Sequence, residues 1–166
     1  MSAKSRRTNK RFFIGTVLVI AAMIFLGVRA NQATANGPLK GFSAIVYRSA
    51  TCGCCQQYIA YLKRNGLKIE EKIAGNDDSD LTAIKDQFNV PKDIRSCHTT
   101  RIGNYTIEGH VPVEAIQKLL TEKPAVAGIS LPGMPSGSPG MPGVKYGTFD
   151  VQSFTASGST SLFMQI

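Results

Sequence analysis

Three of the four cysteines in this chain fall within four residues, directly after a segment with the composition of a β-strand. Cys52, Cys54 and Cys55 follow residues 42–48, which are rich in β-branched and aromatic side chains, and residues 49–51 form the turn between them. Two cysteines spaced like Cys52 and Cys55 are typical of thiol–disulfide centres, whereas three thiolates so close together suit a soft metal ion. The cluster therefore predicts a strand–helix junction that carries redox or metal chemistry.

Residues 1–35 have the features of an export signal. Five basic residues precede an uninterrupted apolar run over residues 12–28, and Ala33-Thr34-Ala35 is a small-x-small site of the kind that a signal peptidase cuts. The run is longer than an ordinary signal core but slightly short for a membrane span, so a cleaved signal peptide and an uncleaved membrane anchor both stay open, and the cleavage site favours the former. We therefore expect a periplasmic domain over residues 36–166, attached to the inner membrane only if the segment is retained.

The net charge has a different meaning once this segment is set apart. The whole chain carries a formal charge of +8, but six of its 19 basic residues and none of its 11 acidic residues lie in residues 1–35. The remaining domain has 13 basic and 11 acidic residues, without a run of basic residues interleaved with aromatic ones. Nucleic-acid binding is therefore not expected.

The spacing of the cysteines argues against a purely structural role. Four cysteines in an exported protein usually form two disulfides that join distant segments. Here only Cys97 lies far from the others, so at most one such disulfide can form. A disulfide from Cys97 to Cys52 or Cys55 remains an alternative, including as an oxidised, metal-free form, but the clustered thiols favour a functional site.

Hydrophobic periodicity and turn residues predict the order β-α-β-α-β-β-α. The expected elements are strand 42–48, a helix from 52–54 to 65, strand 67–73, a helix from 79 to 90, a hairpin of 97–102 and 105–108, and a helix from 112 to 123. With a cysteine motif at the first strand–helix junction, this is the order of an α/β, thioredoxin-like fold. A Gly/Pro/Met-rich run over 131–143 predicts a loop, and 146–154 and 162–166 predict C-terminal strands that extend the sheet edge or fold over it.

Several separate motifs occur in the order that one known family shows. They are Val46-Tyr47-Arg48-Ser49-Ala50-Thr51-Cys52-Gly53-Cys54-Cys55, Ser96-Cys97-His98-Thr99, Ile107-Glu108-Gly109-His110-Val111-Pro112, and the paired runs Pro132-Gly133-Met134-Pro135 and Gly137-Ser138-Pro139-Gly140-Met141. Over about residues 45–154 the chain resembles exported copper-resistance proteins of the CopG type, a family long described only as a domain of unknown function. The resemblance implies a periplasmic thioredoxin-like domain that binds copper through its cysteines. It also implies copper ions and other periplasmic copper-handling proteins as partners, and it leaves a redox role open.

Helix geometry bears on how the three clustered cysteines bind metal. A helix that begins near Cys52 places Cys52 and Cys55 on one side, and its positive end lowers the pKa of both thiols. Cys54 lies about 100° from Cys55 around the axis and should point elsewhere. A single tetrahedral ion bound by all three is then awkward, and a cluster of several Cu(I) ions bridged by thiolates fits better.

Cys97 shifts the balance between the two chemistries. It directly precedes the third predicted strand, where thioredoxin-like enzymes keep a cis-proline beside their cysteines, and Pro91 lies too far upstream to take that place. A fourth sulfur there favours a metal site of Cys52, Cys54, Cys55 and Cys97. The alternative is a thiol–disulfide oxidoreductase in which Cys52 attacks and Cys55 resolves. A structural zinc site is weaker still, because the domain is long enough to form a core without one.

Two histidines and two methionines are secondary candidates for metal ligands. His98 can share a site with Cys97 only if the strand has not yet begun there, because adjacent strand residues point to opposite faces. His110 precedes the last predicted helix, where a solvated or capping role is the alternative. Met134 and Met141 either donate to Cu(I) or pack as hydrophobic plugs, in a loop that could cover the cysteines as a lid.

Overall fold

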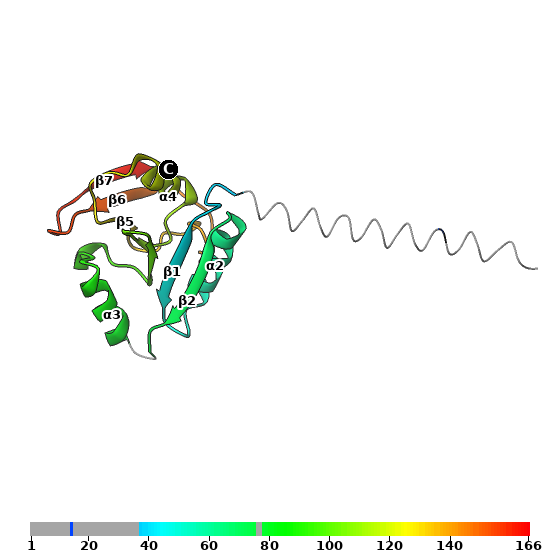
Figure 1. Cartoon of the computed structure of the whole chain (residues 1–166), viewed down its shortest axis with the longest axis horizontal. Helices are drawn as coiled ribbons and strands as arrows, with labels where there is room; N and C mark the ends of the chain where they lie inside the picture. The colour runs from blue at the N-terminus through cyan, green and yellow to red at the C-terminus, as the bar shows by residue number, and fades with distance from the viewer. Residues whose placement is uncertain (1–13, 15–36, 76–77) are drawn as a thin grey trace, which may run out of the picture. The chain divides into compact units, whose positions relative to one another are not determined.

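The computed structural model describes residues 37–75 and 78–166, together with residue 14 (Figure 1). Gly37–Ile166 forms one compact unit. Apart from residue 14, the predicted export segment over residues 1–35 lies outside the described residues. Within the described ranges, no helix combines the length and the apolar character needed to cross a membrane.

A seven-stranded mixed sheet forms the centre of this unit, in the order β2-β1-β3-β4-β5-β6-β7. Its strands are β1 (Ser43–Arg48), β2 (Lys68–Ile73), β3 (His98–Ile102), β4 (Tyr105–Gly109), β5 (Gly128–Leu131), β6 (Asp150–Phe154) and β7 (Thr160–Gln165). The described helices are α2 (Gly53–Arg64), α3 (Asp78–Gln87), α4 (Val113–Glu122) and a short 3-10 turn, η2 (Lys92–Ile94). The β1–β2 and β4–β5 pairs are parallel, and the other neighbouring pairs are antiparallel.

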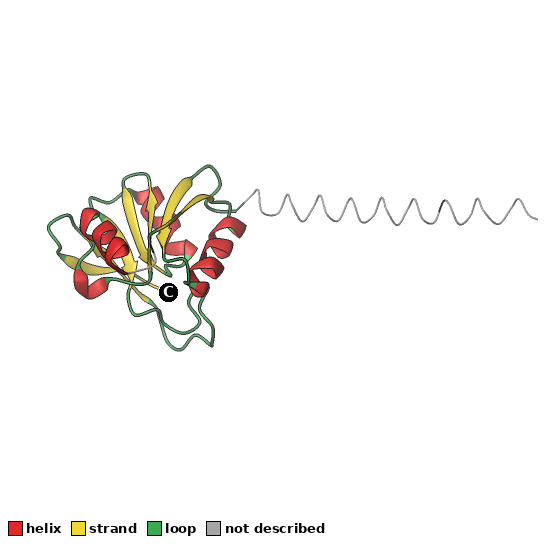
Figure 2. Cartoon of the chain, turned by 90° about the horizontal axis from the view of Figure 1, so that it is seen from below, coloured by secondary structure: helices red, strands yellow, loops and turns green. Residues whose placement is uncertain are grey.

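Helices cover both faces of the sheet (Figure 2). On one face, Tyr58 of α2 and Ile116 of α4 pack in the main hydrophobic core with Ile107 of β4. On the other face, Lys85 of α3 contacts Thr99 of β3. Because successive strand residues point to opposite faces, β3 sends His98 toward α2 and Thr99 toward α3. The cysteine motif follows the end of β1 and forms the start of α2.

The predicted α/β class and element order are confirmed. The elements β1, α2, β2, α3, β3, β4 and α4 follow one another as the sequence predicts, and most of their boundaries agree to within one or two residues. The C-terminal strands β6 and β7 extend the sheet at one edge. The thioredoxin-like assignment itself stays a prediction.

The sequence pattern does not predict β5, which lies between β4 and β6 with all four residues buried. The segment is short, begins with glycine and is followed directly by Pro132-Gly133, so turn residues obscure its hydrophobic pattern. A glycine is required at position 128, because a Cβ there would collide with the backbone oxygen of Thr106 on β4. The predicted loop over 131–143 therefore begins one residue later, because Leu131 ends the strand.

Candidate metal site

The first turn of α2 is built around a sulfur atom. Cys52 is the N-cap residue, with an extended backbone (φ −74°, ψ 92°), and its Sγ accepts the backbone N–H of Cys55 at 3.3 Å. Oxygen-bearing side chains usually satisfy the free N–H groups at a helix start, and here a sulfur does so. A disulfide joins Cys52 to Cys55, whose Cα atoms lie 5.3 Å apart. The structure thus brings together the pair expected from its spacing.

Cys54 belongs to the same site. Its Sγ lies 3.5 Å from the Sγ of Cys52, so the prediction that Cys54 points elsewhere is wrong. The offset of about 100° per residue separates Cys54 from Cys55 inside the helix, but it does not describe a residue outside the helix. Cys52 stands outside it as the extended N-cap, and its side chain reaches across the first turn toward Cys54.

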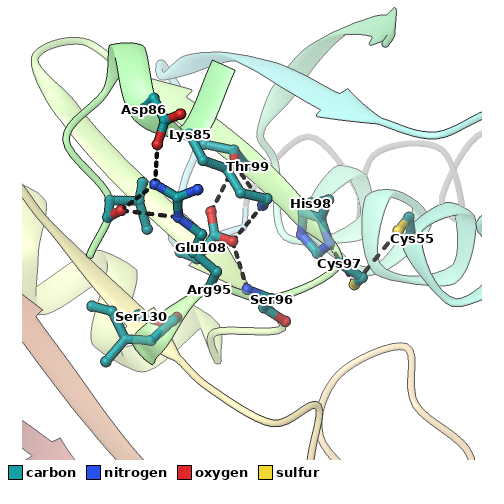
Figure 3. Close-up of polar contacts among 12 residues, drawn as sticks. Cys55, Lys85, Asp86, Arg95, Ser96, Cys97, His98, Thr99, Glu108 and Ser130 are labelled. Carbon is teal, nitrogen blue, oxygen red and sulfur yellow. Dashed lines mark hydrogen bonds and ion pairs between the residues drawn. The ribbon is translucent and has the colours of Figure 1, made fainter. Parts of the chain in front are cut away.

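Cys97 completes a group of four sulfur atoms. It directly precedes β3, and its Sγ lies 3.6 Å from that of Cys55 (Figure 3). The Sγ atoms of Cys52, Cys54, Cys55 and Cys97 all lie within 4.8 Å of one another. Two sulfurs bound to one ion at about 2.3 Å can be at most about 4.6 Å apart. Once the disulfide is reduced, small movements would let these residues bind metal.

A second group of metal-binding atoms shares Cys97. The Sγ of Cys97 lies 3.2 Å from Nδ1 of His98 and 3.1 Å from Nε2 of His110. Since β3 begins at His98, Cys97 lies before the strand, which is the condition under which these neighbours can face one site. Both imidazoles are fully buried and pack against the ring of Tyr58.

The hydrogen bond to Pro139 fixes the tautomer of His110. Its Nδ1 lies 2.6 Å from the carbonyl oxygen of Pro139, which can only accept, so Nδ1 carries the proton. The lone pair of Nε2 is then directed at Cys97, as in metal-binding histidines whose other nitrogen donates to a carbonyl. Burial lowers the pKa of His110, although the Pro139 carbonyl opposes that shift. The imidazole is therefore neutral at pH 7 and able to ligate.

The environment of His98 is less suitable for metal binding than that of His110. Burial, followed by the charges of His110 and Lys85, lowers its pKa well below the usual value. Its Nε2 is buried without a hydrogen-bond partner among the described residues. If Nδ1 bound a metal, the proton would have to sit on this unpartnered nitrogen.

The thiol of Cys97 is protonated at neutral pH in the absence of metal. Burial, followed by the neighbouring Cys54, raises its pKa to about 12, and the Lys85 ammonium acts in the opposite direction. A metal ion that binds here must therefore displace a proton, which makes binding dependent on pH.

The two methionines lie in different places. Met134 lines a cavity of about 450 Å³ together with Cys52, Cys97 and Lys85. Met141 lines a separate hollow beside Tyr61 of α2. Of the two methionines, Met134 is therefore the one that lines a cavity together with cysteines of the site.

The Gly/Pro/Met loop contacts the edge of the site. Pro139 bonds His110, and at Gly140 the loop approaches so closely that a Cβ would lie 2.6 Å from the backbone nitrogen of Tyr58 and 3.0 Å from the carbonyl oxygen of Cys54. The loop thus packs on the first turns of α2, next to the cysteines.

Sequence reasoning missed a buried ion pair beside the site. Nζ of Lys85 lies 2.5 Å from Oε1 of Glu108, and both side chains are almost wholly buried. Burial raises the pKa of Glu108, while Lys85 and two further hydrogen-bond donors oppose that rise. The one signal was an acidic residue inside an otherwise buried strand pattern, but its partner comes from a different element.

This fold and site define a mixed α/β domain with a cysteine cluster that could bind metal. Two solved structures, "Copper resistance protein copG- Form 2" and "Copper resistance protein copG- Form 1", are similar to it, each with a TM-score of 0.67. They are 37% and 38% identical, each covers 75% of this chain, and the chain covers 98% and 96% of theirs. The chain belongs to the CopG family of copper-resistance proteins.

A family profile described as "Protein of unknown function, DUF411" also matches residues 94–141, which contain Cys97 and both histidines. No curated protein sequence matches the chain.

Proposed function

We propose that this chain is a periplasmic copper-binding protein that serves copper resistance and binds Cu(I) through Cys52, Cys54, Cys55 and Cys97. One observation carries the proposal: these four sulfur atoms, from segments 42 residues apart, lie within 4.8 Å of one another. Thiolates and thioethers are the ligands that Cu(I) prefers. The names of the similar solved structures support copper as the metal.

Residues 1–35 direct export in this proposal, and residues 36–166 bind the metal. The protein touches the membrane only through residues 1–35, if these are retained. It exchanges copper with other periplasmic copper-handling proteins.

More than one copper ion binds, in this proposal, because the sulfur of Cys97 belongs to both groups of metal-binding atoms. A thiolate at Cys97 bridges a copper ion among the sulfurs and one bound by His110. His110 is the better nitrogen ligand, because its Nδ1–H already has an acceptor in Pro139. Binding through His98 would leave a buried N–H without a partner among the described residues, at a cost of about 1–3 kcal/mol.

Anaerobic loading with Cu(I) tests the proposal. The reduced protein should retain more than one copper per chain, and Cys97→Ser should lose most of it. Ser49→Ala is a matched control, because Ser49 lines the same cavity without a sulfur. Undiminished copper in the Cys97 variant would contradict the four-sulfur site. A ratio of one copper per chain in the unmodified protein would contradict the binding of several copper ions.

The disulfide between Cys52 and Cys55 favours a second candidate function, thiol–disulfide exchange at the start of α2. In that case Cys52→Ser abolishes the reduction of insulin disulfides, whereas Cys54→Ser and Cys97→Ser retain it. A chain that binds copper but does not reduce insulin excludes this alternative.

A further inference from the structure

The segment that carries Cys97 is attached to the sheet by side chains. The β1–β3 register begins at the pair Arg48 and His98, one residue after Cys97. Upstream, Oγ of Ser130 donates to the carbonyl oxygen of Ile94 at 2.6 Å. The backbone N–H of Ser96 donates to Oε1 of Glu108 at 2.7 Å (Figure 3).

The carboxylate of Glu108 is itself held by two further donors. Lys85 Nζ lies 2.5 Å from Oε1, and Thr99 donates to Oε2 at 2.7 Å. Lys85 also bonds the Thr99 hydroxyl at 3.0 Å. These three side chains come from α3, β3 and β4, so the carboxylate is fixed from several directions.

Stability alone does not account for this ion pair. Removing two charges from water costs about as much as their attraction returns, so apolar residues of similar volume would serve the core equally well. The neighbouring Gly109 also accommodates Ser96: it has a positive φ of 75°, and a Cβ there would lie 2.5 Å from Oγ of Ser96. Two adjacent residues of β4 are thus arranged around the residue that precedes Cys97.

We propose that Glu108 is a positioning residue that holds Cys97 against Cys55 by accepting the Ser96 N–H, with Lys85 and Thr99 fixing its carboxylate. Ligands have to be held within about 0.5 Å of a productive geometry. Glu108 meets this requirement through the backbone of Ser96, the residue before Cys97, and is not itself a metal ligand in this proposal. Its effect on copper affinity rests on the proposed function, whereas its effect on the position of Cys97 does not.

Two double variants of the full chain isolate the acceptor. Lys85→Met with Glu108→Gln removes both charges but keeps an oxygen for Ser96, and Lys85→Met with Glu108→Leu removes the charges and the oxygen. In a background of Cys52→Ser and Cys54→Ser, the Cys55–Cys97 disulfide is equilibrated with glutathione, without metal. We expect the equilibrium constant for forming this disulfide to be about tenfold lower with leucine than with glutamine, because the effective concentration of two groups depends on how well the folded chain orients them.

Equal constants for the two double variants would overturn the proposal. Asp86→Asn is the matched control, since it breaks the ion pair with Arg95 on the same segment and should leave the constant unchanged. If the leucine variant does not fold, Thr99→Val takes its place, and a constant unchanged by that substitution would also overturn the proposal.

Cu(I) affinity, measured with all four cysteines present, should fall in parallel with the disulfide constant. A fall in the disulfide constant with unchanged copper affinity would support the positioning by Glu108 and remove Cys97 from the copper site.

Discussion

The sulfur of Cys97 lies 3.1 Å from Nε2 of His110, although the two residues are 13 positions apart. Cys97 ends the segment before β3, and His110 follows β4 directly, so the β3–β4 hairpin brings them together. This contact joins the sulfur cluster at the start of α2 to the buried histidine pair. The candidate site is therefore one continuous set of sulfur and nitrogen atoms.

His110 should contribute to copper binding more than His98. We expect His110→Gln to lower Cu(I) affinity about tenfold, or about 1.4 kcal/mol, because the variant lacks the imidazole nitrogen that faces Cys97. His98→Gln should have a clearly smaller effect, since a ligating His98 would carry a buried, unpartnered N–H. Competition with a chromophoric Cu(I) chelator measures both affinities. A larger loss in the His98 variant would reverse the assignment.

Local geometry accounts for what the sequence predicts correctly. Cys52 and Cys55 come together because the side chain of an N-cap residue reaches the third residue of the helix that it caps, and the turn residues around α2 mark where that helix begins and ends. The position of Cys97 just before β3 could also be predicted from the sequence, because the hairpin turn at Gly103-Asn104 sets the register of the strands that it joins.

The backbone at the helix start and the contacts between distant elements determine what the sequence pattern does not predict. The position of Cys54 depends on the extended N-cap conformation of Cys52, which helical periodicity does not describe. The pairing of Lys85 with Glu108 joins two elements 23 residues apart, and no local pattern connects them. Strand β5 is defined by its neighbours β4 and β6 rather than by its own four residues.

The two methionines should differ in their effect on copper. Met134 lines the cavity that contains Cys52 and Cys97, whereas Met141 lines a separate hollow. Met134→Leu keeps the volume but removes the thioether, so we expect Cu(I) affinity to fall by up to about tenfold. Met141→Leu is the matched control and should leave affinity unchanged. Equal affinities in both variants would show that Met134 only packs.

Gly140 should be required for the loop to pack on α2. An added Cβ would lie 2.6 Å from the backbone nitrogen of Tyr58, and φ is 83°. Gly140→Ala should therefore lower the free energy of unfolding by about 2–3 kcal/mol. At Gly147 φ is also positive but no atom lies within 4 Å, so Gly147→Ala should cost only about 1 kcal/mol. Urea denaturation compares the two, and equal losses would mean that the loop does not contact α2 closely.

The metal-free domain should lose stability as the pH falls below neutrality. Burial lowers the pKa of His98 well below its usual value of 6.5, and burial also lowers that of His110. Below pH 6.5 the unfolded chain takes up protons that the folded chain excludes. The stability present above that pH is therefore lost as the pH falls toward the folded-state pKa, by up to about 1.4 kcal/mol per pH unit for each histidine.

Denaturation of the reduced, metal-free protein between pH 7.5 and 5 measures this slope. His98→Gln removes one titrating group, so its free energy of unfolding should depend less steeply on pH, and the remaining slope should come from His110. If the free energy of unfolding of His98→Gln depends on pH as steeply as that of the unmodified protein, His98 takes up its proton in the folded state. The interpretation that both buried imidazoles beside Cys97 stay neutral would then be wrong.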